Sequence, residues 1–292
     1  MQPDVDPMGA LMLYAVGVPL VLLLIFVEAV LCNVKNWDYY KSSDTLCSLG
    51  LLTGNIVVNA GIKAGTLGFY LYLYQFRWLD ISKLLPVWAL WLLSFVAIDF
   101  VFYLYHRVSH RMRFLWAVHM NHHSSEEMNF VVAFRQAWLG PATKIPFFAS
   151  LPLIGFDPTI TLVAGVGATL WGVVGHTKIV GKLWRPIEWV FNTPSHHRVH
   201  HGSNPEYIDK NYGNLFIIWD RMFGTFEPER APVVYGLRHN VGTYNPVTIT
   251  LMDWKVLFAK MRSADSLADA FCYFFAPPGW APDTDKVSVT NQ

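Results

Sequence analysis

Long apolar runs separated by short polar segments dominate the N-terminal half of the chain. A helix that crosses the hydrocarbon core of a bilayer needs about 20 predominantly apolar residues. The pattern therefore predicts membrane-spanning helices over about 9–32, 46–74 and 84–105. The first is interrupted only by Glu28, and the second is long enough to tilt or to extend beyond the bilayer.

A fourth apolar region, about 145–175, contains Gly155, Asp157 and Pro158 near its middle. These helix-breaking residues favour a broken hairpin, in which two helices are joined by a tight turn. A single kinked or re-entrant helix is the alternative. The pattern therefore predicts an all-α integral membrane protein with about four to five transmembrane helices. Residues 1–292 are interpreted as a single membrane-embedded domain, because no internal repeat or low-complexity segment divides them.

Counting crossings places the polar segments after the third span on one side of the membrane. With the N-terminus outside, the loop at 33–45 is inside, the loop at 76–83 is outside, and residue 106 is inside again. The hairpin then returns the chain to that same side. We therefore expect a helical cap there, formed by 106–144 and by the chain after residue 176.

The distribution of cations indicates which side carries the cap. Residues 1–34 and the turn at 155–158 contain no Lys or Arg. Because short cytoplasmic loops carry an excess of Lys and Arg, the cap is predicted to be cytoplasmic. The N-terminal MQPDVDP lacks the positive start of a signal peptide, so the first apolar run is expected to be a retained span. The cations of the cap are Arg107, Arg111, Arg113, Arg135, Lys144, Lys178, Lys182, Arg185 and Arg198.

Two segments of the cap have an amphipathic pattern, 184–191 and about 246–261, and are expected to lie on the membrane interface. Residues 231–292 are interpreted as a cytosolic or interfacial tail, loose after Pro277.

Composition agrees with a membrane protein. Hydrophobic residues make up 53% of the chain and charged residues 15%, against about 25% charged residues in ordinary soluble domains. A net charge of +1, without a basic patch interleaved with aromatic residues, argues against nucleic-acid binding. The three cysteines form no CxxC pair, so they predict neither a disulfide framework nor a thiolate metal site.

Histidine is the residue type that points to chemistry. Ten of the 11 histidines lie between positions 106 and 201, in the patterns HRVSH (106–110), HMNHH (119–123) and HHRVHH (196–201), with His176 alone. Histidine is the commonest metal ligand among side chains. Positions three and four apart share one face of a helix, so each pattern presents its imidazoles together. His239 stands apart from these clusters and is interpreted as an ordinary surface residue.

The chain must change direction for these clusters to meet. His110 and His119 are nine residues apart and would lie on opposite faces of one straight helix, so we predict a bend between Arg111 and Trp116. The third cluster is predicted to form a short helix over about 194–201. Thr193 is a suitable N-cap, Pro194 suits the first helical position and Gly202 would end the helix.

The number of imidazoles favours two metal ions. His106 and His110, two three-histidine faces and His176 supply nine donors, which suits two ions with four or five ligands each, since one ion seldom takes more than six. His196 lies beside the third face and its ligation stays open. Metal-bound histidines often donate their second N–H to a carboxylate. The candidates for that role are Asp99, Asp209 and Asp220.

The three histidine patterns resemble the histidine boxes of the fatty acid hydroxylase/sterol desaturase superfamily. The stretch RVHHGSNPEYIDKNYG…IIWDRMFGTF (198–226) is similar to the family's usual continuation. HHSSEEMNF (122–130), followed by Arg135, most resembles the alkylglycerol monooxygenase-like branch. The resemblance covers roughly 95–230, interpreted as the catalytic region. The closing PPGW (277–280) is similar to bacterial members, which favours a bacterial inner membrane over the endoplasmic reticulum.

This resemblance implies two iron ions that activate O2 and oxidise an unactivated C–H bond of a lipid, by hydroxylation or by desaturation. The lipid would be an ether lipid, a sterol or hopanoid, or a fatty acyl chain. The chain has no Rossmann fingerprint, cysteine cluster or CxxCH, so electrons are expected from a ferredoxin, cytochrome or reductase partner, or from a reduced pterin. The implied ligands are His106, His110, His119, His122, His123, His176, His197, His200 and His201.

A divalent-metal transporter, or a metal-binding membrane protein without oxygenase activity, is the alternative. Transport would need ionisable groups distributed across the membrane. Only Glu28 and Asp99 lie within the predicted spans, which disfavours this alternative.

Overall fold

The computed structural model describes the backbone of residues 8–282 and the side chains of residues 12–62 and 65–282. Within this part of the chain the fold is helical, with two isolated β-bridges and no strand, which confirms the all-α prediction. The helices are α1 (Met8–Lys35), α2 (Ser42–Tyr74), α3 (Ile81–Leu84), α4 (Val87–Arg111), α5 (Arg113–His123), the 3-10 helix η1 (Phe130–Phe134), α6 (Gly140–Phe148), α7 (Ser150–Ile154), α8 (Pro158–Val174), α9 (Arg185–Val190), α10 (Pro194–His200), α11 (Ile218–Met222), α12 (Pro246–Arg262) and α13 (Leu267–Phe275).

Three of the described helices are long and apolar enough to cross a bilayer. They contribute Met12–Lys35 of α1, Ser42–Ile62 of α2 and Val87–Arg111 of α4, so the chain is a membrane protein. The third span starts and ends later than predicted. Pro86 is the N-cap of α4, and the helix continues past residue 105 because the segment carrying His106 and His110 is still helical.

The fourth apolar region forms a broken hairpin, as predicted. Its first half is divided into α6 and α7, and α8 returns after a turn at 155–157. Gly155 has a φ of 125°, and a Cβ there would collide with the carbonyl oxygen of Leu79, so the turn requires glycine. The Asp157 carboxylate caps α8 by accepting hydrogen bonds from the N–H groups of Thr159 (2.8 Å) and Ile160 (3.1 Å).

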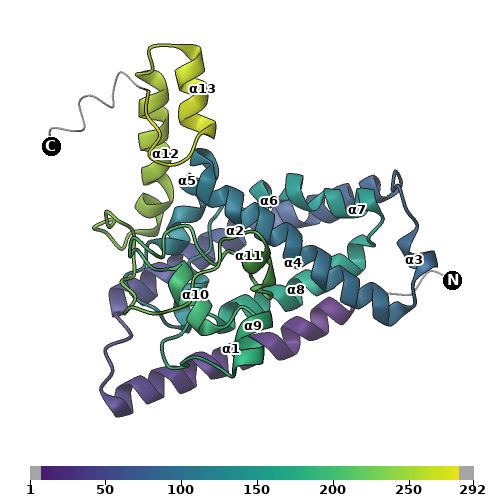
Figure 1. Cartoon of the computed structure of the whole chain (residues 1–292), viewed down its shortest axis with the longest axis horizontal. Helices are drawn as coiled ribbons and strands as arrows, with labels where there is room; N and C mark the ends of the chain where they lie inside the picture. Colours follow the sequence, from purple (N-terminus) through teal and green to yellow (C-terminus); the bar gives the residue numbers. More distant parts are fainter. Residues whose placement is uncertain (1–7, 283–292) are drawn as a thin grey trace.

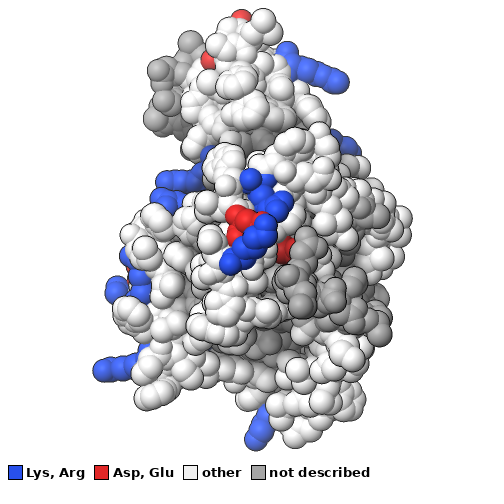
Figure 2. Space-filling model, turned by 90° about the vertical axis from the view of Figure 1, so that its right-hand side faces the viewer, with Lys and Arg blue, Asp and Glu red and all other residues white. Residues whose placement is uncertain are grey.

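The hairpin turn lies at the end of the molecule away from the histidines. Backbone hydrogen bonds join Trp78 N–H to the Leu153 carbonyl (2.8 Å) and Leu79 N–H to the Ile154 carbonyl (3.2 Å). The turn is therefore at the end where α2 stops and α4 begins, on the right of Figure 1. Figure 2 shows this end, where few charged side chains are visible and one cluster stands out. Arg77 and Lys83 both pair with Asp80 in this loop.

At the opposite end, the buried carboxylate of Glu28 joins α1 to three other segments. It accepts hydrogen bonds from the Tyr40 hydroxyl (2.6 Å), the Phe130 N–H (2.8 Å) and the Thr177 hydroxyl. Glu28 therefore brings together the end of α1, the segment just before α2, the start of η1 and the residue that follows His176. This agrees with the prediction that the histidine-bearing segments share one face.

The cap is built at this end. Helix α4 stops at Arg111, Met112 is extended (φ −126°, ψ 121°) and α5 starts at Arg113, so the predicted bend is confirmed. Helix α10 occupies Pro194–His200, also as predicted. The amphipathic segments correspond to α9 and α12, and α13 was not anticipated.

The predicted loose tail is wrong for its first residues. Trp280 packs edge-on against Tyr273 of α13, with ring centroids 5.2 Å apart, and the Trp280 N–H donates to the Pro277 carbonyl (3.0 Å). The remainder of the predicted tail, 283–292, lies outside the described residues. Helices α12 and α13 form a hairpin that projects from the body (Figure 1).

Candidate metal centre

Nine histidines gather in two groups inside the cap. In each group, one ring nitrogen per histidine lies within 4.8 Å of all the others. The groups contain the nine residues singled out in the sequence, divided five and four. The five-histidine group is His106, His110, His119, His123 and His200, and the four-histidine group is His122, His176, His197 and His201.

Two short helices serve both groups. Helix α5 gives His119 and His123 to the five-histidine group and His122 to the four-histidine group. Helix α10 and its C-cap divide in the same way, with His200 in one group and His201 in the other. Because adjacent residues on a helix point about 100° apart, each helix reaches two neighbouring points at once. The His123 and His201 rings stack across the two groups, with centroids 4.6 Å apart.

The Nε2 atoms converge as they would around an ion. In the five-histidine group, His119 Nε2 lies 2.9 Å from His106 Nε2 and 3.1 Å from His123 Nε2. In the four-histidine group, His197 Nε2 lies 2.9 Å from His176 Nε2 and 3.1 Å from His201 Nε2. Imidazoles bound to one ion at about 2.0–2.1 Å, at right angles to each other, would have nitrogens about 3 Å apart. The geometry fits a metal ion in each group.

Two further ring nitrogens also indicate a bound ion. His110 Nε2 and His200 Nε2 are buried and have no hydrogen-bond partner among the described residues. A buried polar atom without a partner is costly, by about 1–3 kcal/mol, unless an ion or water completes it. Both atoms belong to the five-histidine group, so an ion there would satisfy them.

Burial keeps the rings of the cap in the form that binds metal. It lowers the pKa of His176 to about 4 and that of His200 to about 3. Burial, reinforced by neighbouring imidazoles, also lowers the pKa values of His119, His122, His123, His197 and His201 well below the ordinary value. Neutral imidazoles offer a lone pair without first losing a proton.

Backbone carbonyls fix the orientation of several rings. His106 Nδ1 lies 2.8 Å from the Tyr212 carbonyl, His176 Nδ1 2.8 Å from that of Gly172, and His200 Nδ1 2.9 Å from that of Lys210. A ring that donates from Nδ1 to a carbonyl presents its Nε2 lone pair to the metal.

One carboxylate lies beside a histidine of the centre. Asp209 Oδ1 is 3.6 Å from His110 Nδ1, and Asp209 Oδ2 accepts a hydrogen bond from Arg111 (3.1 Å). Burial alone would raise the pKa of Asp209, but its interactions with His110, Arg111 and Tyr212 together outweigh burial and lower that pKa. Of the three predicted carboxylate partners, Asp209 is placed to orient a ring.

The prediction for Asp99 as a histidine partner is wrong. Its oxygens accept hydrogen bonds from Leu215 N–H (2.7 Å), Phe216 N–H (3.0 Å) and Trp219 Nε1–H (2.9 Å). Asp99 is two helical turns before His106, about 10 Å along α4, so it fastens the 215–219 segment to the span instead of contacting an imidazole.

The prediction that Asp220 contacts a histidine of the centre directly is also wrong. Asp220 accepts hydrogen bonds from the N–H groups of Tyr212 and Gly213 (both 2.8 Å) and from the Thr225 hydroxyl (2.7 Å). Asp220 therefore supports the segment whose Tyr212 carbonyl contacts His106, so that Tyr212 stands between Asp220 and the His106 ring.

His196, left open by the sequence, belongs to neither group. Its Nε2 lies 3.0 Å from Glu188 Oε2, and its Nδ1 accepts a weak hydrogen bond from Thr193 N–H (3.4 Å), which completes a capping box at the start of α10. Glu188 also accepts hydrogen bonds from the Thr193 and Ser195 hydroxyls (both 2.8 Å).

Sequence reasoning missed a buried ionic network behind α5. Arg135 donates to Asp44 Oδ1 (2.5 Å) and to the Ser124 hydroxyl (2.6 Å), and the Ser125 hydroxyl donates to Asp44 Oδ2 (2.9 Å). The Arg135 backbone also forms a hydrogen bond with His122. The signal was present, since HHSSEEMNF and Arg135 carried part of the family resemblance, but Asp44 lies about 90 residues earlier.

Comparisons with known proteins agree with this site. Residues 91–225, which include all nine histidines, match the family model for fatty acid hydroxylase. The chain is 31% identical over 272 residues to alkylglycerol monooxygenase of Xenopus tropicalis, covering 91% of this chain and 60% of the relative. It is 35% identical over 269 residues to alkylglycerol monooxygenase of Danio rerio, covering 90% and 59%. The ornithine lipid hydroxylase OlsE of Rhizobium tropici is 29% identical over 142 residues, covering 48% and 42%.

The chain thus spans at most 60% of the length of these relatives. No solved structure matches it. The family model and the similarity over most of the chain agree with the helical membrane fold and with the two histidine groups. Residues 91–225 of the chain form a fatty acid hydroxylase domain.

Proposed function

We propose that the protein hydroxylates a membrane lipid, using O2 and two iron ions held by the two histidine groups. One C–H bond of the lipid is converted to C–OH. The second oxygen atom leaves as water, with two electrons and two protons supplied by an external donor. The observation that carries this proposal is the convergence of nine imidazoles, seven buried and two half-buried, in groups of five and four at one end of the spans.

The choice of iron is a proposal on chemical grounds. All-imidazole sites suit Zn, Cu, Fe or Ni; Zn is redox-inactive and would not activate O2, and the resemblance of the histidine patterns to the fatty acid hydroxylase family favours Fe over Cu and Ni. Bound iron would supply the oxidising chemistry that activates O2. The chain would fix both ions through α5 and α10, which contribute to both groups. The group of four would hold its ion with one histidine ligand fewer than the group of five.

The substrate class follows from the relatives. The names alkylglycerol monooxygenase and ornithine lipid hydroxylase both describe oxygen insertion into a lipid. They favour hydroxylation over desaturation, and an alkylglycerol ether lipid is the first substrate to test. A lipid in the bilayer would reach the centre from the spans, because His106 and His110 lie on the last turns of α4.

Electrons and orientation are further parts of the proposal. The chain contains no Rossmann fingerprint, cysteine cluster or CxxCH, which favours a separate ferredoxin, cytochrome or reductase, or a reduced pterin. The histidine end is proposed to face the cytoplasm, in a bacterial inner membrane, because the segments after residue 105 are rich in Lys and Arg.

The decisive experiment combines metal analysis with turnover. Protein purified in lipid nanodiscs should contain about two iron ions per chain and should transfer one atom of ¹⁸O from ¹⁸O2 into an alkylglycerol when a reductant is supplied. Loss of two hydrogens without oxygen uptake would instead indicate a desaturase. Exchangeable zinc without turnover would favour the metal-binding or transport alternative. The exposed His239 offers a matched control, since His239→Ala should change neither iron content nor turnover.

A further inference from the structure

The α12–α13 hairpin exposes apolar side chains on both of its helices. On α12, Val247, Leu251 and Phe258 are exposed and lie within about 40° of one another around the helix axis. Exposed large apolar side chains that form a continuous stripe mark an interaction surface more often than scattered ones do.

Helix α13 has the sharper division of faces. Leu267 and Phe271 are 91% and 63% exposed, and Phe275 continues the same line at i+8, whereas Tyr273 on the opposite side is buried. Aromatic and aliphatic residues on one face of a short helix are typical of helices that lie in a membrane interface.

The root of the hairpin is at interfacial depth. Ile249 of α12 is buried against Cys47 and Leu51 of α2, and the Pro246 ring lies 2.9 Å from where a Cβ on Gly50 would be. These α2 residues are five to nine positions into a membrane-spanning helix that starts at Ser42, or about 8–14 Å along its axis. Helices that lie on a bilayer bury their apolar faces about 5–10 Å into the headgroup boundary. Helix α12 therefore starts at the level where such a helix would lie.

The direction of the hairpin agrees with that depth. In Figure 1 it runs across the direction of α1 and α2, away from the body of the molecule. The exposed cations Lys255 and Arg262 lie beside the α12 stripe, both on the same side of it, and their long side chains can reach lipid phosphates.

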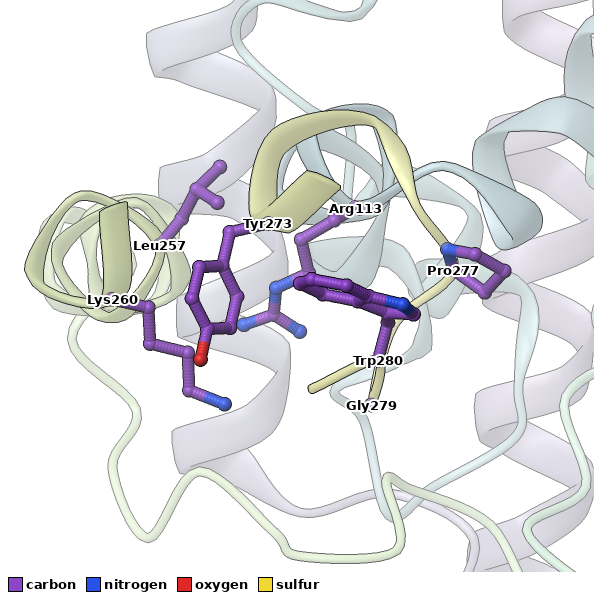
Figure 3. A pocket seen from close by; sticks show the side chains of 7 residues that line it. All are labelled: Arg113, Leu257, Lys260, Tyr273, Pro277, Gly279 and Trp280. Carbon is purple, nitrogen blue, oxygen red and sulfur yellow. The ribbon is translucent and has the colours of Figure 1, made fainter. Parts of the chain in front are cut away.

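The hairpin is firmly attached to α5. Figure 3 shows Arg113, Tyr273 and Trp280 pointing toward one another at its base, around a cavity of about 10 Å³. That volume has room for about one water molecule and not for a lipid headgroup. Arg113 forms an ion pair with Asp253 (2.7 Å) and its N–H donates to the Ala276 carbonyl (3.0 Å).

We propose that the α12–α13 hairpin is a membrane-surface element that lies in the plane of the histidine-side leaflet with Leu267 and Phe271 inserted among the lipids. Because Arg113 and Phe114 begin α5, which carries three of the nine histidines, the hairpin holds that helix against the membrane surface. This proposal does not depend on which reaction the centre performs.

The test measures the environment of single spin labels in the full chain, in phosphatidylcholine–phosphatidylglycerol nanodiscs. Leu267→Cys and Phe271→Cys are labelled in a Cys272→Ser background, because Cys32 and Cys47 are buried. Val16→Cys, exposed on α1, is the lipid-facing control, and Glu206→Cys, exposed in the cap, is the aqueous control. Labels at 267 and 271 should collide with O2 as often as the label at 16 and at least several-fold less often with a water-soluble nickel complex than the label at 206.

Two results would overturn the proposal. Nickel collision rates at 267 and 271 equal to those at 206 would place the hairpin in water. Protection from both O2 and nickel would mean that a second copy or another protein covers this face. Because labelled variants are compared only when their metal content matches the unlabelled chain, a misfolded variant cannot imitate either result.

Discussion

Glu188 Oε2 lies 3.0 Å from His196 Nε2, directly before the helix turn that presents His197, His200 and His201 to the metal centre. Burial alone would raise the pKa of Glu188, but hydrogen bonds from His196, Leu183 N–H, Ser195 and Thr193 outweigh it and lower the pKa to about 2. The carboxylate is therefore ionised at neutral pH and binds Thr193, Ser195 and His196 at the start of α10. A histidine outside both groups thus helps to place three histidines that belong to them.

Removing this carboxylate should disturb both histidine groups. Glu188→Ala leaves the Thr193 and Ser195 hydroxyls and His196 without their acceptor, which should cost on the order of 1–3 kcal/mol of stability and lower metal content. Thermal unfolding and metal analysis of the purified variant measure both effects. The exposed Glu206→Ala is the control. An unchanged melting temperature together with full metal content would contradict the role given to Glu188.

The division into groups predicts which ligand serves which ion. His200→Ala removes a donor from the five-histidine group and His122→Ala removes one from the four-histidine group. Removing a residue that hydrogen-bonds to a metal ligand typically lowers metal affinity or activity about 10–100-fold. Removing the ligand itself should therefore lower turnover by more than about 100-fold. Each variant should also lose metal, measured per chain, while His239→Ala retains it. Wild-type turnover in either ligand variant would refute the site.

The buried Arg135–Asp44 pair should contribute far more to the free energy of unfolding than an exposed ion pair does. Arg135→Ala leaves the Asp44 carboxylate buried without its partner, which should cost about 3–5 kcal/mol. Arg111→Ala breaks the more exposed pair with Asp209 and should cost about 1 kcal/mol or less. Denaturant or thermal unfolding of the two variants gives the comparison. Equal, small losses would mean that the buried network does not support the end of α5.

Metal removal should make stability sensitive to acid. Burial lowers the pKa of His176 to about 4 and of His200 to about 3, whereas both rings titrate near 6.5 when unfolded. The unfolded chain therefore binds more protons below pH 6.5, and the stability of the chelated protein should be full above that pH and fall as the pH drops toward 4. Melting temperatures of chelated protein between pH 7.5 and 5 measure this.

The metal-loaded protein should show a weaker dependence over the same range, because protons must displace the ions before the rings can titrate. A chelated protein whose melting temperature stays flat or rises as the pH is lowered would show that the buried rings are not held neutral.

The sequence by itself determined the membrane spans, the hairpin turn, the bend after Arg111 and the nine histidines that converge. These features depend on local properties: the number of consecutive apolar residues, the breaking effect of Gly155 and Pro158, and the i, i+3 and i+4 spacing of imidazoles. The signal for each span, turn and histidine cluster lies within about one helix length of chain, whereas His176, which stands alone, was identified from the topology and the family resemblance.

Only the tertiary structure decided how these parts are shared. The adjacent His122 and His123 serve different groups, and so do His200 and His201, because neighbouring side chains on a helix diverge and the two points they reach depend on how α5 packs beside α10. Packing also sent Asp99 to the 215–219 segment instead of a histidine, and it joined Asp44 to Arg135 across 91 residues. Contacts of that range arise from how helices are arranged in space, for which the spacing of residues along the chain carries no direct signal.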